Sequence, residues 1–270
     1  LENINSEVSN LDHEFSVIIV NDASTETKPE LSFNLEKLNS IKIINMKENR
    51  GHARCNAAGL KHIYENEEFD YVIPMDGDGE DRPVEIKQLV DNLNYHPDKP
   101  IVGERIKRSE GVFFKFCYFS HKLITSTFTG QSIKYGNYTC LPKSIVEKMI
   151  NEKATWSSFS GALAKIAKDR APIPSERGKR YFGPSKMSFK NLLIHSLSIV
   201  SVFKTNVLIR SILFLIVYFF LIHQNITPIM LIPVLLVFIL IVSVIIISKR
   251  ENLEEFNNSL INISNIDNLK

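Results

Sequence analysis

The sequence predicts an α/β domain with a mostly parallel sheet and helices on both faces, followed by a helical hairpin that spans a membrane. Short β-branched runs alternate with helix-length amphipathic segments in the first 190 residues, which predicts the domain. Nearly all sustained apolar sequence lies after residue 205, which predicts the hairpin. The chain of 270 residues is 44% hydrophobic and 23% charged, a composition that excludes a mainly disordered protein.

Four apolar runs are expected to be strands, at 15–20, 41–46, 70–75 and 100–103. Helical periodicity follows the second run at 51–66 and the third run at 84–94. This alternation indicates parallel pairing with helices on both faces. Ligands of such sheets bind at the carboxyl ends of the strands, so the polar residues that follow each run are candidate site residues.

The most apolar segment, 228–248, has 21 residues and no charge. As a helix it is about 31 Å long, which is enough to span a hydrocarbon core. The preceding run, 207–222, has 16 residues and contains Arg210, so it spans if Arg210 extends back toward Lys204. The sequence therefore predicts two transmembrane helices between residues 205 and 250.

Basic residues flank the outer ends of this hairpin at Lys204, Arg210, Lys249 and Arg250, whereas the loop 223–227 has none. The positive-inside rule then places a domain at 1–187 and a polar tail at 251–270 in the cytoplasm. Residues 1–14 are polar and acidic and do not resemble a secretory signal, which agrees with this topology. The segment 188–204 has helical apolar spacing, so it is either an amphipathic helix in the headgroup region or a core helix of the domain.

Charge and cysteine content disfavour several other classes of protein. The formal charge of +2 is too small to indicate a nucleic-acid partner. Cys55, Cys117 and Cys140 have no C-x-x-C spacing, which argues against a disulfide framework or a zinc knuckle. The histidines are scattered, so any metal is expected to have oxygen ligands.

Asp76, Asp78 and Glu80 alternate along a glycine-spaced turn after the third run. If their carboxylates converge, they suit Mg²⁺ or Mn²⁺, with phosphate oxygens of a substrate completing the shell. The alternative is an acidic turn that caps the helix beginning near Pro83. An EF-hand is disfavoured because Lys87 stands at the twelfth loop position.

A basic segment, RGKRYFGPSK at 177–186, lies just before the membrane-proximal residues. Its guanidinium groups are suited to hold a phosphate in a bidentate way, such as a lipid phosphate at the membrane. The alternative is a polybasic patch on anionic lipid, and both can hold together.

Five motifs now appear in a fixed order along the chain. They are VNDAS at 20–24, ENRGHARCNAAG at 48–59, MDGDGEDRP at 75–83, VGERIKR at 102–108 and ERGKRYFGPSKMS at 176–188. With the hairpin, they resemble family 2 glycosyltransferases, and most of all the membrane-attached branch of dolichol-phosphate mannosyltransferase and bacterial polyprenyl-phosphate glycosyltransferases. The resemblance covers roughly residues 14 to 250. It implies a GT-A fold, which is Rossmann-like, and an integral protein of a bacterial plasma membrane.

The resemblance also implies a reaction: metal-dependent, inverting transfer of a sugar from a UDP- or GDP-hexose to a polyprenyl phosphate, either undecaprenyl or dolichyl. Asp22 would contact the base, and Asn49, Gly51 and Arg54 would shape the nucleotide pocket. Asp76, Asp78 and Glu80 would bind the Mg²⁺ or Mn²⁺ that bridges the diphosphate. The residues expected to act in catalysis, on the donor or on the acceptor phosphate, are Asp78, Arg105, Arg108, Arg177 and Lys186, and Ser185 would contact the donor phosphates.

One part of the family pattern is not found. Members begin with a further strand, whereas residues 1–11 resemble the end of the helix that follows it. We therefore expect an N-terminally incomplete domain. Two alternatives remain open: a transferase with a glycan or glycolipid acceptor, and a non-catalytic relative. The hairpin is also a candidate surface for self-association.

Overall fold

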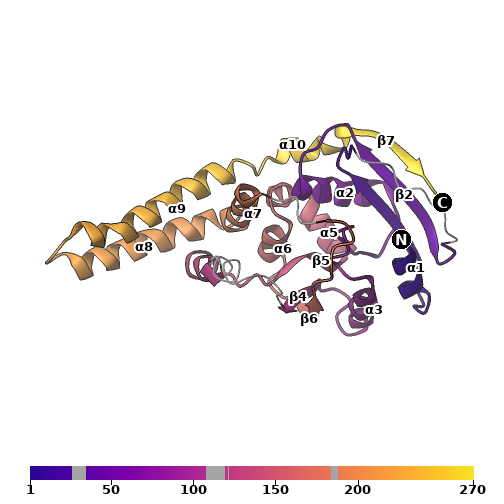
Figure 1. Cartoon of the computed structure of the whole chain (residues 1–270), viewed down its shortest axis with the longest axis horizontal. Coiled ribbons are helices and arrows are strands. Elements are labelled where there is room, and N and C mark those ends of the chain that lie inside the picture. Colours follow the sequence, from indigo (N-terminus) through magenta and orange to yellow (C-terminus); the bar gives the residue numbers. More distant parts are fainter. Residues whose placement is uncertain (26–34, 108–118, 121, 184–187) are drawn as a thin grey trace.

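The computed structural model describes residues 1–25, 35–107, 119–120, 122–183 and 188–270. A mixed α/β domain lies at one end, and the paired helices α8 and α9 project from it as a long arm (Figure 1). The predicted fold class, an α/β domain followed by an apolar helical hairpin, is confirmed.

The first sheet has the strand order β1-β2-β7. β1 (Phe15–Asn21) runs parallel to β2 (Leu38–Met46), and β7 (Ile263–Asn268) pairs antiparallel with the other edge of β2. Helix α2 (His52–Asn66) packs on β1 so closely that a Cβ at Gly59 would lie 2.9 Å from Cγ2 of Val20. Helix α1 (Glu2–Val8) buries Val8 in a core shared with Leu38 and Ile41.

The second sheet has the order β3-β5-β4-β6. Its strands are β3 (Tyr71–Val72), β4 (Ile101–Lys107), β5 (Tyr135–Pro142) and β6 (Ala171–Glu176). β4 and β6 are parallel, whereas β5 is antiparallel to both β3 and β4. The helices of this half are α3 (Ile86–Asp91), α5 (Lys143–Ile150) and α6 (Phe159–Ile166).

The sheets are more mixed than predicted, because three of the five pairings among the described residues are antiparallel. The sequence analysis missed three strands, β5, β6 and β7. Two of them, β5 and β7, take part in all three antiparallel pairings. Among the described residues, β1 pairs only with β2, and β3 pairs only with β5. No described strand lies between β1 and β3, so the domain has two separate sheets. The further strand expected from the family pattern stays a prediction.

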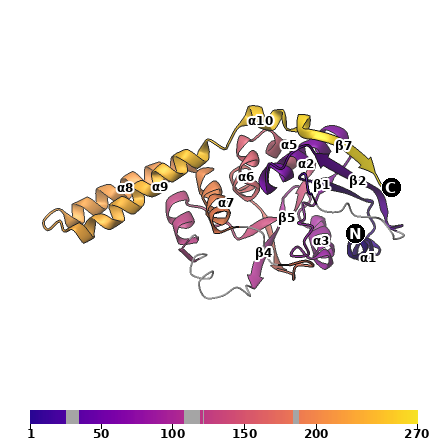
Figure 2. The same cartoon turned by 45° about the horizontal axis from the view of Figure 1, so that its top comes forward.

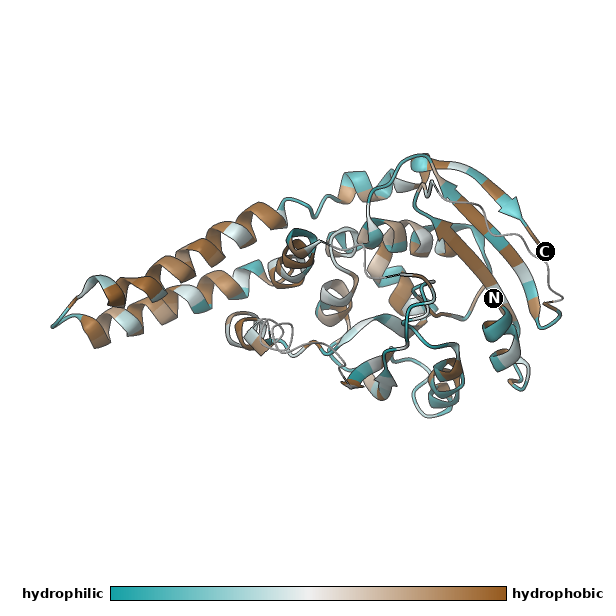
Figure 3. Ribbon diagram, in the orientation of Figure 1, coloured by the Kyte–Doolittle hydropathy of each residue, from teal (hydrophilic) through white to brown (hydrophobic). Residues whose placement is uncertain are grey.

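The arm consists of α8 (Lys204–Ile222) and α9 (Ile232–Ser248), with a 3₁₀ turn at Pro228–Leu231 before α9. Both are long and apolar enough to cross a membrane, by length and composition. They lie side by side, and the hydroxyl of Tyr218 donates to the carbonyl of Met230 at 2.8 Å. Both helices are mainly hydrophobic, as Figure 3 shows, and many of their large apolar side chains are exposed. Exposed apolar helices of this length suit a lipid surround.

The segment expected as an amphipathic or core helix contains helix α7 (Phe189–Ser201), which has an exposed half and a buried half. Its first half exposes Phe189 and Leu193, whereas Ile199 and Val200 near its end are buried. Ser188 caps it by accepting the N–H of Asn191 at 3.2 Å. The buried end of α7 packs where the domain meets the arm, because Val200 clusters with Val207 of α8 and Val244 of α9. Figure 2 shows α7 at the base of the arm.

The segment 251–270, expected as a polar tail, instead folds back onto the domain. It forms α10 (Leu253–Asn257), a 3₁₀ turn at Ser259–Asn262 and β7. Phe256 is fully buried and stacks on Trp156, with ring centroids 5.4 Å apart. This burial anchors a segment whose polar composition predicted exposure, and we refer to residues 251–270 as the C-terminal strap.

Candidate functional site

Asp22 closes the loop at the carboxyl ends of β1 and β2. Its Oδ1 accepts the backbone N–H of Arg50 at 3.0 Å, and its Oδ2 accepts that of Gly51 at 2.9 Å. The side-chain amide of Asn49 donates to the carbonyl of Asp22 at 2.9 Å. Gly51 has φ of 90°, a conformation that favours glycine. The structure therefore brings Asp22, Asn49 and Gly51 into direct contact.

His52, the first residue of α2, connects this loop to the second sheet. Its Nε2 lies 3.6 Å from Oδ1 of Asp76 and in short contact with the side-chain amide of Asn137 in β5. The sequence analysis did not select His52. Its position directly after Gly51, at the start of a predicted helix that faces the strand ends, was the available signal.

The acidic turn, residues 76–81, follows β3 and is held by its own carboxylates. Asp81 accepts the N–H of Asp76 at 3.0 Å, and Asp78 accepts that of Glu80 at 3.0 Å. The short helix at Pro83–Glu85 has no side-chain cap. The carboxylates of Asp78 and Asp81 thus cap the turn itself, and the helix-capping alternative is wrong for this segment.

Two arginines of the basic segment lie on this turn. Arg180 donates from Nε to Oε1 of Glu80 at 2.9 Å, and its terminal nitrogen is 3.1 Å from Oδ2 of Asp78. Arg177 donates to Oε2 of Glu80. Burial raises the pKa of Glu80, but the hydrogen bonds and charges of Arg177 and Arg180 outweigh it, and the net pKa is lowered. Glu80 is therefore an ionised partner of both arginines.

Backbone contacts also dock the basic segment on the acidic turn. The N–H of Gly178 donates to the carbonyl of Glu80 at 2.8 Å, and that of Tyr181 to the carbonyl of Asp78 at 2.9 Å. A Cβ at Gly178 would lie 2.2 Å from the carbonyl oxygen of Gly79. The fit therefore requires glycine at position 178.

Asp81 is buried beneath the acidic turn, with 7% of its surface exposed. Burial, and then the negative charge of Asp76, raise the pKa of this carboxyl to about 7, while the charge of Arg105 in β4 acts against them. The guanidinium of Arg105 passes close to Gly136, whose Cβ would lie 3.3 Å from it. Arg105 thus reaches the same end of the second sheet as the acidic turn.

The acidic turn does not form a ready metal cage. Among the residues that the structure describes, no three His, Cys, Asp or Glu side chains converge in a way that could hold a metal ion. The expected convergence of Asp76, Asp78 and Glu80 is not seen, because Glu80 is turned toward the arginines. The oxygen donors of Asp76 and Asp78 still have the chemistry that Mg²⁺ and Mn²⁺ prefer.

Arg54, the fourth residue expected in the nucleotide pocket, faces the C-terminal strap. Its terminal nitrogen donates to Oε2 of Glu255 at 3.1 Å, and its guanidinium lies 5.2 Å from the ring centre of Trp156. Three other predicted site residues, Arg108, Ser185 and Lys186, lie outside the described residues.

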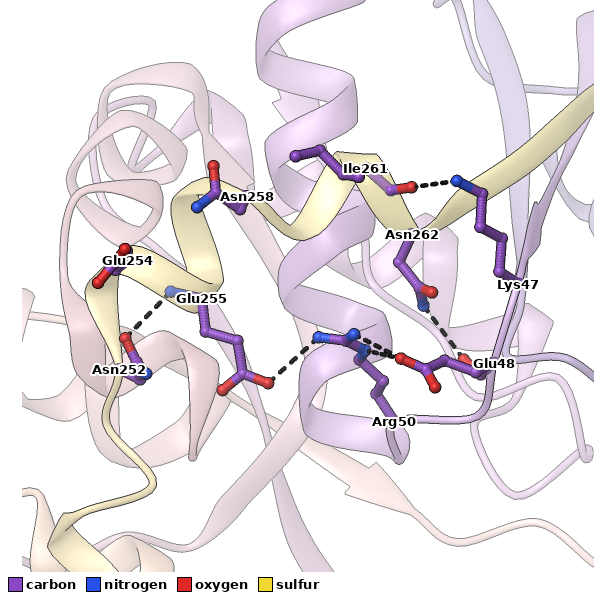
Figure 4. Close-up of a pocket in the computed structure, with 9 residues that line it drawn as sticks. All are labelled: Lys47, Glu48, Arg50, Asn252, Glu254, Glu255, Asn258, Ile261 and Asn262. Atoms are coloured by element: carbon purple, nitrogen blue, oxygen red, sulfur yellow. Dashed lines mark hydrogen bonds and ion pairs between the residues drawn. The ribbon is translucent and has the colours of Figure 1, made fainter.

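An open pocket of roughly 670 Å³ lies where the strap crosses the loop between β2 and α2 (Figure 4). Lys47, Glu48 and Arg50 line one side, and residues of α10 and the following 3₁₀ turn line the other. None of Asp76, Asp78 or Glu80 belongs to its lining. The pocket thus lies between the strap and the segment that follows β2, apart from the acidic turn.

Comparison with known proteins now identifies the domain. The sequence profile described as Glycosyl transferase family 2 matches residues 1–145, which is more than half of the chain. The chain belongs to glycosyl transferase family 2. The matched region holds the Asp22 loop, α2, the acidic turn and β4, so the resemblance drawn from the motifs is confirmed.

The chain is also similar to undecaprenyl-phosphate 4-deoxy-4-formamido-L-arabinose transferases of Salmonella paratyphi B, Salmonella newport and Salmonella heidelberg. It is 28% identical to each over 204 residues, which is 72% of this chain and 59% of the relative. The chain therefore spans less than two thirds of the length of these curated relatives. Its basic segment, arm and strap lie beyond the part that the family profile matches.

Proposed function

We propose that this family 2 protein transfers a sugar from a nucleotide sugar to a polyprenyl phosphate at the cytoplasmic face of a membrane. The observation that carries the proposal is the contact of Arg177 and Arg180 with the acidic turn, just ahead of the apolar arm. Donor chemistry and acceptor chemistry would thereby meet beside the bilayer. The name of the relatives, which are undecaprenyl-phosphate sugar transferases, supports the same acceptor class.

The loop closed by Asp22 and the start of α2 would receive the nucleoside. Asp76 and Asp78 would hold Mg²⁺ or Mn²⁺, which when bound supplies positive charge to the departing diphosphate. Arg177 and Arg180 would exchange their carboxylate partners for phosphate oxygens, since guanidinium groups bind both in the same geometry. Without donor, the carboxylates of the acidic turn neutralise the arginines. With donor bound, the metal would neutralise the carboxylates, and the diphosphate would neutralise the arginines.

In the proposed reaction an oxygen of the acceptor phosphate attacks the anomeric carbon of the sugar. The new bond joins that carbon to the acceptor oxygen while its bond to the diphosphate breaks, and the nucleoside diphosphate leaves. Attack from the opposite side inverts the anomeric configuration. A phosphomonoester is largely dianionic at pH 7, so no strong general base is required. The residues near Arg105 would orient the acceptor.

The test uses the full chain in detergent with undecaprenyl phosphate, Mn²⁺ and UDP- and GDP-linked sugars, including 4-deoxy-4-formamido-L-arabinose. We expect a lipid-linked sugar that forms with Mn²⁺ and not with EDTA. Undecaprenol, which lacks the phosphate, is the control acceptor. Equal transfer to undecaprenol would favour the glycan or glycolipid alternative. If none of the nucleotide sugars binds, the alternative of a non-catalytic relative is favoured.

Orientation and assembly are part of the same proposal. Lys204, Lys249 and Arg250, at the domain-side ends of the arm, support a cytoplasmic location for the domain and the strap by the positive-inside rule. Protease treatment of sealed right-side-out vesicles should leave the domain intact and cleave it after permeabilisation. Cross-linking in the membrane would show whether arms of neighbouring copies associate.

A further inference from the structure

The C-terminal strap contacts α2 at the turn that would receive the nucleotide. Only residues 249–252 separate the membrane helix α9 from α10. From there the chain crosses the start of α2 and adds β7 to the edge of β2. The chain after the arm is therefore positioned to take part in the nucleotide site.

Glu255 of α10 makes two ion pairs with this turn. Its Oε1 lies 3.2 Å from a terminal nitrogen of Arg50, and its Oε2 lies 3.1 Å from one of Arg54 (Figure 4 shows the pair with Arg50). Between 23% and 31% of each of the three side chains is exposed, so the pairs are only partly screened by water.

The neighbouring residue, Phe256, supports Arg54 from a second direction. Phe256 stacks on Trp156, and the guanidinium of Arg54 lies over the same indole, 5.2 Å from the ring centre. Among the described residues, Glu255 is the acceptor of the only hydrogen bond that Arg54 donates from its side chain, and the buried Nε has no partner. Loss of Glu255 would leave Arg54 held by the indole alone.

The same turn is thus held from two sides. Asp22 fixes the backbone of Arg50 and Gly51 from the end of β1, and Glu255 fixes the side chains of Arg50 and Arg54 from the strap. Further strap contacts lie alongside, because Asn262 donates to the carbonyl of Glu48 at 3.1 Å. The strap therefore acts on the segment that carries Asn49 and Gly51.

We infer that the strap is part of the nucleotide-binding site, with Glu255 as the positioning residue that holds Arg54 and the 49–51 loop in place for the donor. This inference rests on the proposed function. The nucleotide site would then depend on residues that precede the arm in the sequence and on residues that follow it. The distance of the nucleotide from the membrane would then be set by the short connection after α9.

The test compares Glu255→Gln with Glu254→Gln in the full chain. Glu254 is the matched control because it lies beside Glu255 on α10, and its side chain is exposed. Glu255→Gln should raise the KM for the nucleotide sugar about fivefold and leave kcat within about twofold, as expected for loss of ground-state positioning. Combining it with Arg54→Gln should add little to the effect of Arg54→Gln alone.

A second readout does not depend on activity. Hydrogen exchange of residues 49–58 should be faster in Glu255→Gln than in Glu254→Gln, while emission of the single tryptophan, Trp156, stays unchanged and shows that the core is intact. Unchanged exchange with an unchanged KM would overturn the inference, as would a loss confined to kcat. If the wild type bound no nucleotide sugar, the proposed function would fail, and the exchange measurement would still decide whether Glu255 positions the loop.

Discussion

Arg180 lies across the acidic turn, with its Nε donating to Oε1 of Glu80 at 2.9 Å. This contact joins the loop after β3 to the segment after β6. The cations expected to bind phosphate therefore rest on the carboxylates expected to bind metal. Each group neutralises the other in the ligand-free protein, and donor binding would require both to exchange partners.

Asp78→Asn should remove most metal-dependent donor binding, by at least about tenfold, because the turn would lose one of its charged oxygen donors. Titration of Mn²⁺ and nucleotide sugar by calorimetry measures this change. Carbonate extraction should show wild-type membrane insertion. Asp91→Asn is the control, since Asp91 lies on α3 and pairs with Lys87 at the surface. Retained transfer with an unchanged metal requirement would count against a metal role for the turn.

Arg180→Gln should have opposite effects on metal binding and on turnover. The acidic turn would lose a cation that competes for Asp78 and Glu80, so Mn²⁺ should bind about threefold to tenfold more tightly in the absence of donor. Transfer should nevertheless fall more than about tenfold, because a charge that stabilises the leaving diphosphate is missing.

Lys179→Gln is the matched control for metal affinity. It removes the same charge one residue away, from an exposed side chain for which the structure shows no ion pair among the described residues. Its Mn²⁺ affinity should change less than that of Arg180→Gln. Equal changes in the two variants would mean that net charge, and not the contact with Glu80, controls metal binding.

Gly178→Ala should undock the basic segment. Its Cβ would lie 2.2 Å from the backbone oxygen of Gly79, a clash that a side-chain rotation cannot relieve. Trypsin should then cleave at Arg177, Lys179 or Arg180 faster than in the wild type. Gly77→Ala, where a Cβ meets nothing within 4 Å, should keep the wild-type cleavage rate. Identical digestion of all three proteins would show that the segment does not require the close approach.

The elements predicted correctly from the sequence are those marked by a run of β-branched residues and by polar residues directly after it. β1 and β2 are β-branched runs, and the polar residues after them, Asp22 and Asn49, lie together because parallel strands end at one edge. β7 was missed because its sequence, ISNIDN, has only two apolar residues and is stabilised by pairing with β2. β5 was missed because Gly136 lies within it and Pro142 ends it, and β6 was missed because two of its six residues are prolines.

For the candidate site, the sequence could suggest residues by their local spacing but could not show their long-range contacts. Asp76, Asp78 and Glu80 were found from their spacing, but spacing cannot show that Glu80 turns to Arg177 and Arg180. The contact of Glu255 with Arg54 joins residues separated by 201 positions, and no local pattern marks such a pair. Long-range ion pairs depend on the completed fold and on the short link after α9.

Asp81 makes stability depend on pH in a direction opposite to that of most carboxylates. Burial, with the charge of Asp76, raises its pKa from 3.8 to about 7 in the folded protein. Between pH 3.8 and about pH 7, Asp81 keeps its proton in the folded state and has released it in the unfolded state. The stability of the folded state should therefore fall as the pH rises. The loss should be roughly 2 to 3 kcal/mol between pH 5 and pH 8.

Asp81→Asn should remove most of this pH dependence, because the amide is neutral and its oxygen can still accept the N–H of Asp76. Thermal unfolding in EDTA at pH 5 and pH 8 measures the difference without interference from metal. The wild type should melt at a lower temperature at pH 8, and the variant should melt at nearly the same temperature at both. Asp91→Asn, at an exposed site, should behave as the wild type. A wild-type slope that persists in Asp81→Asn would assign the dependence to other groups and leave Asp81 as an ionised cap of the turn.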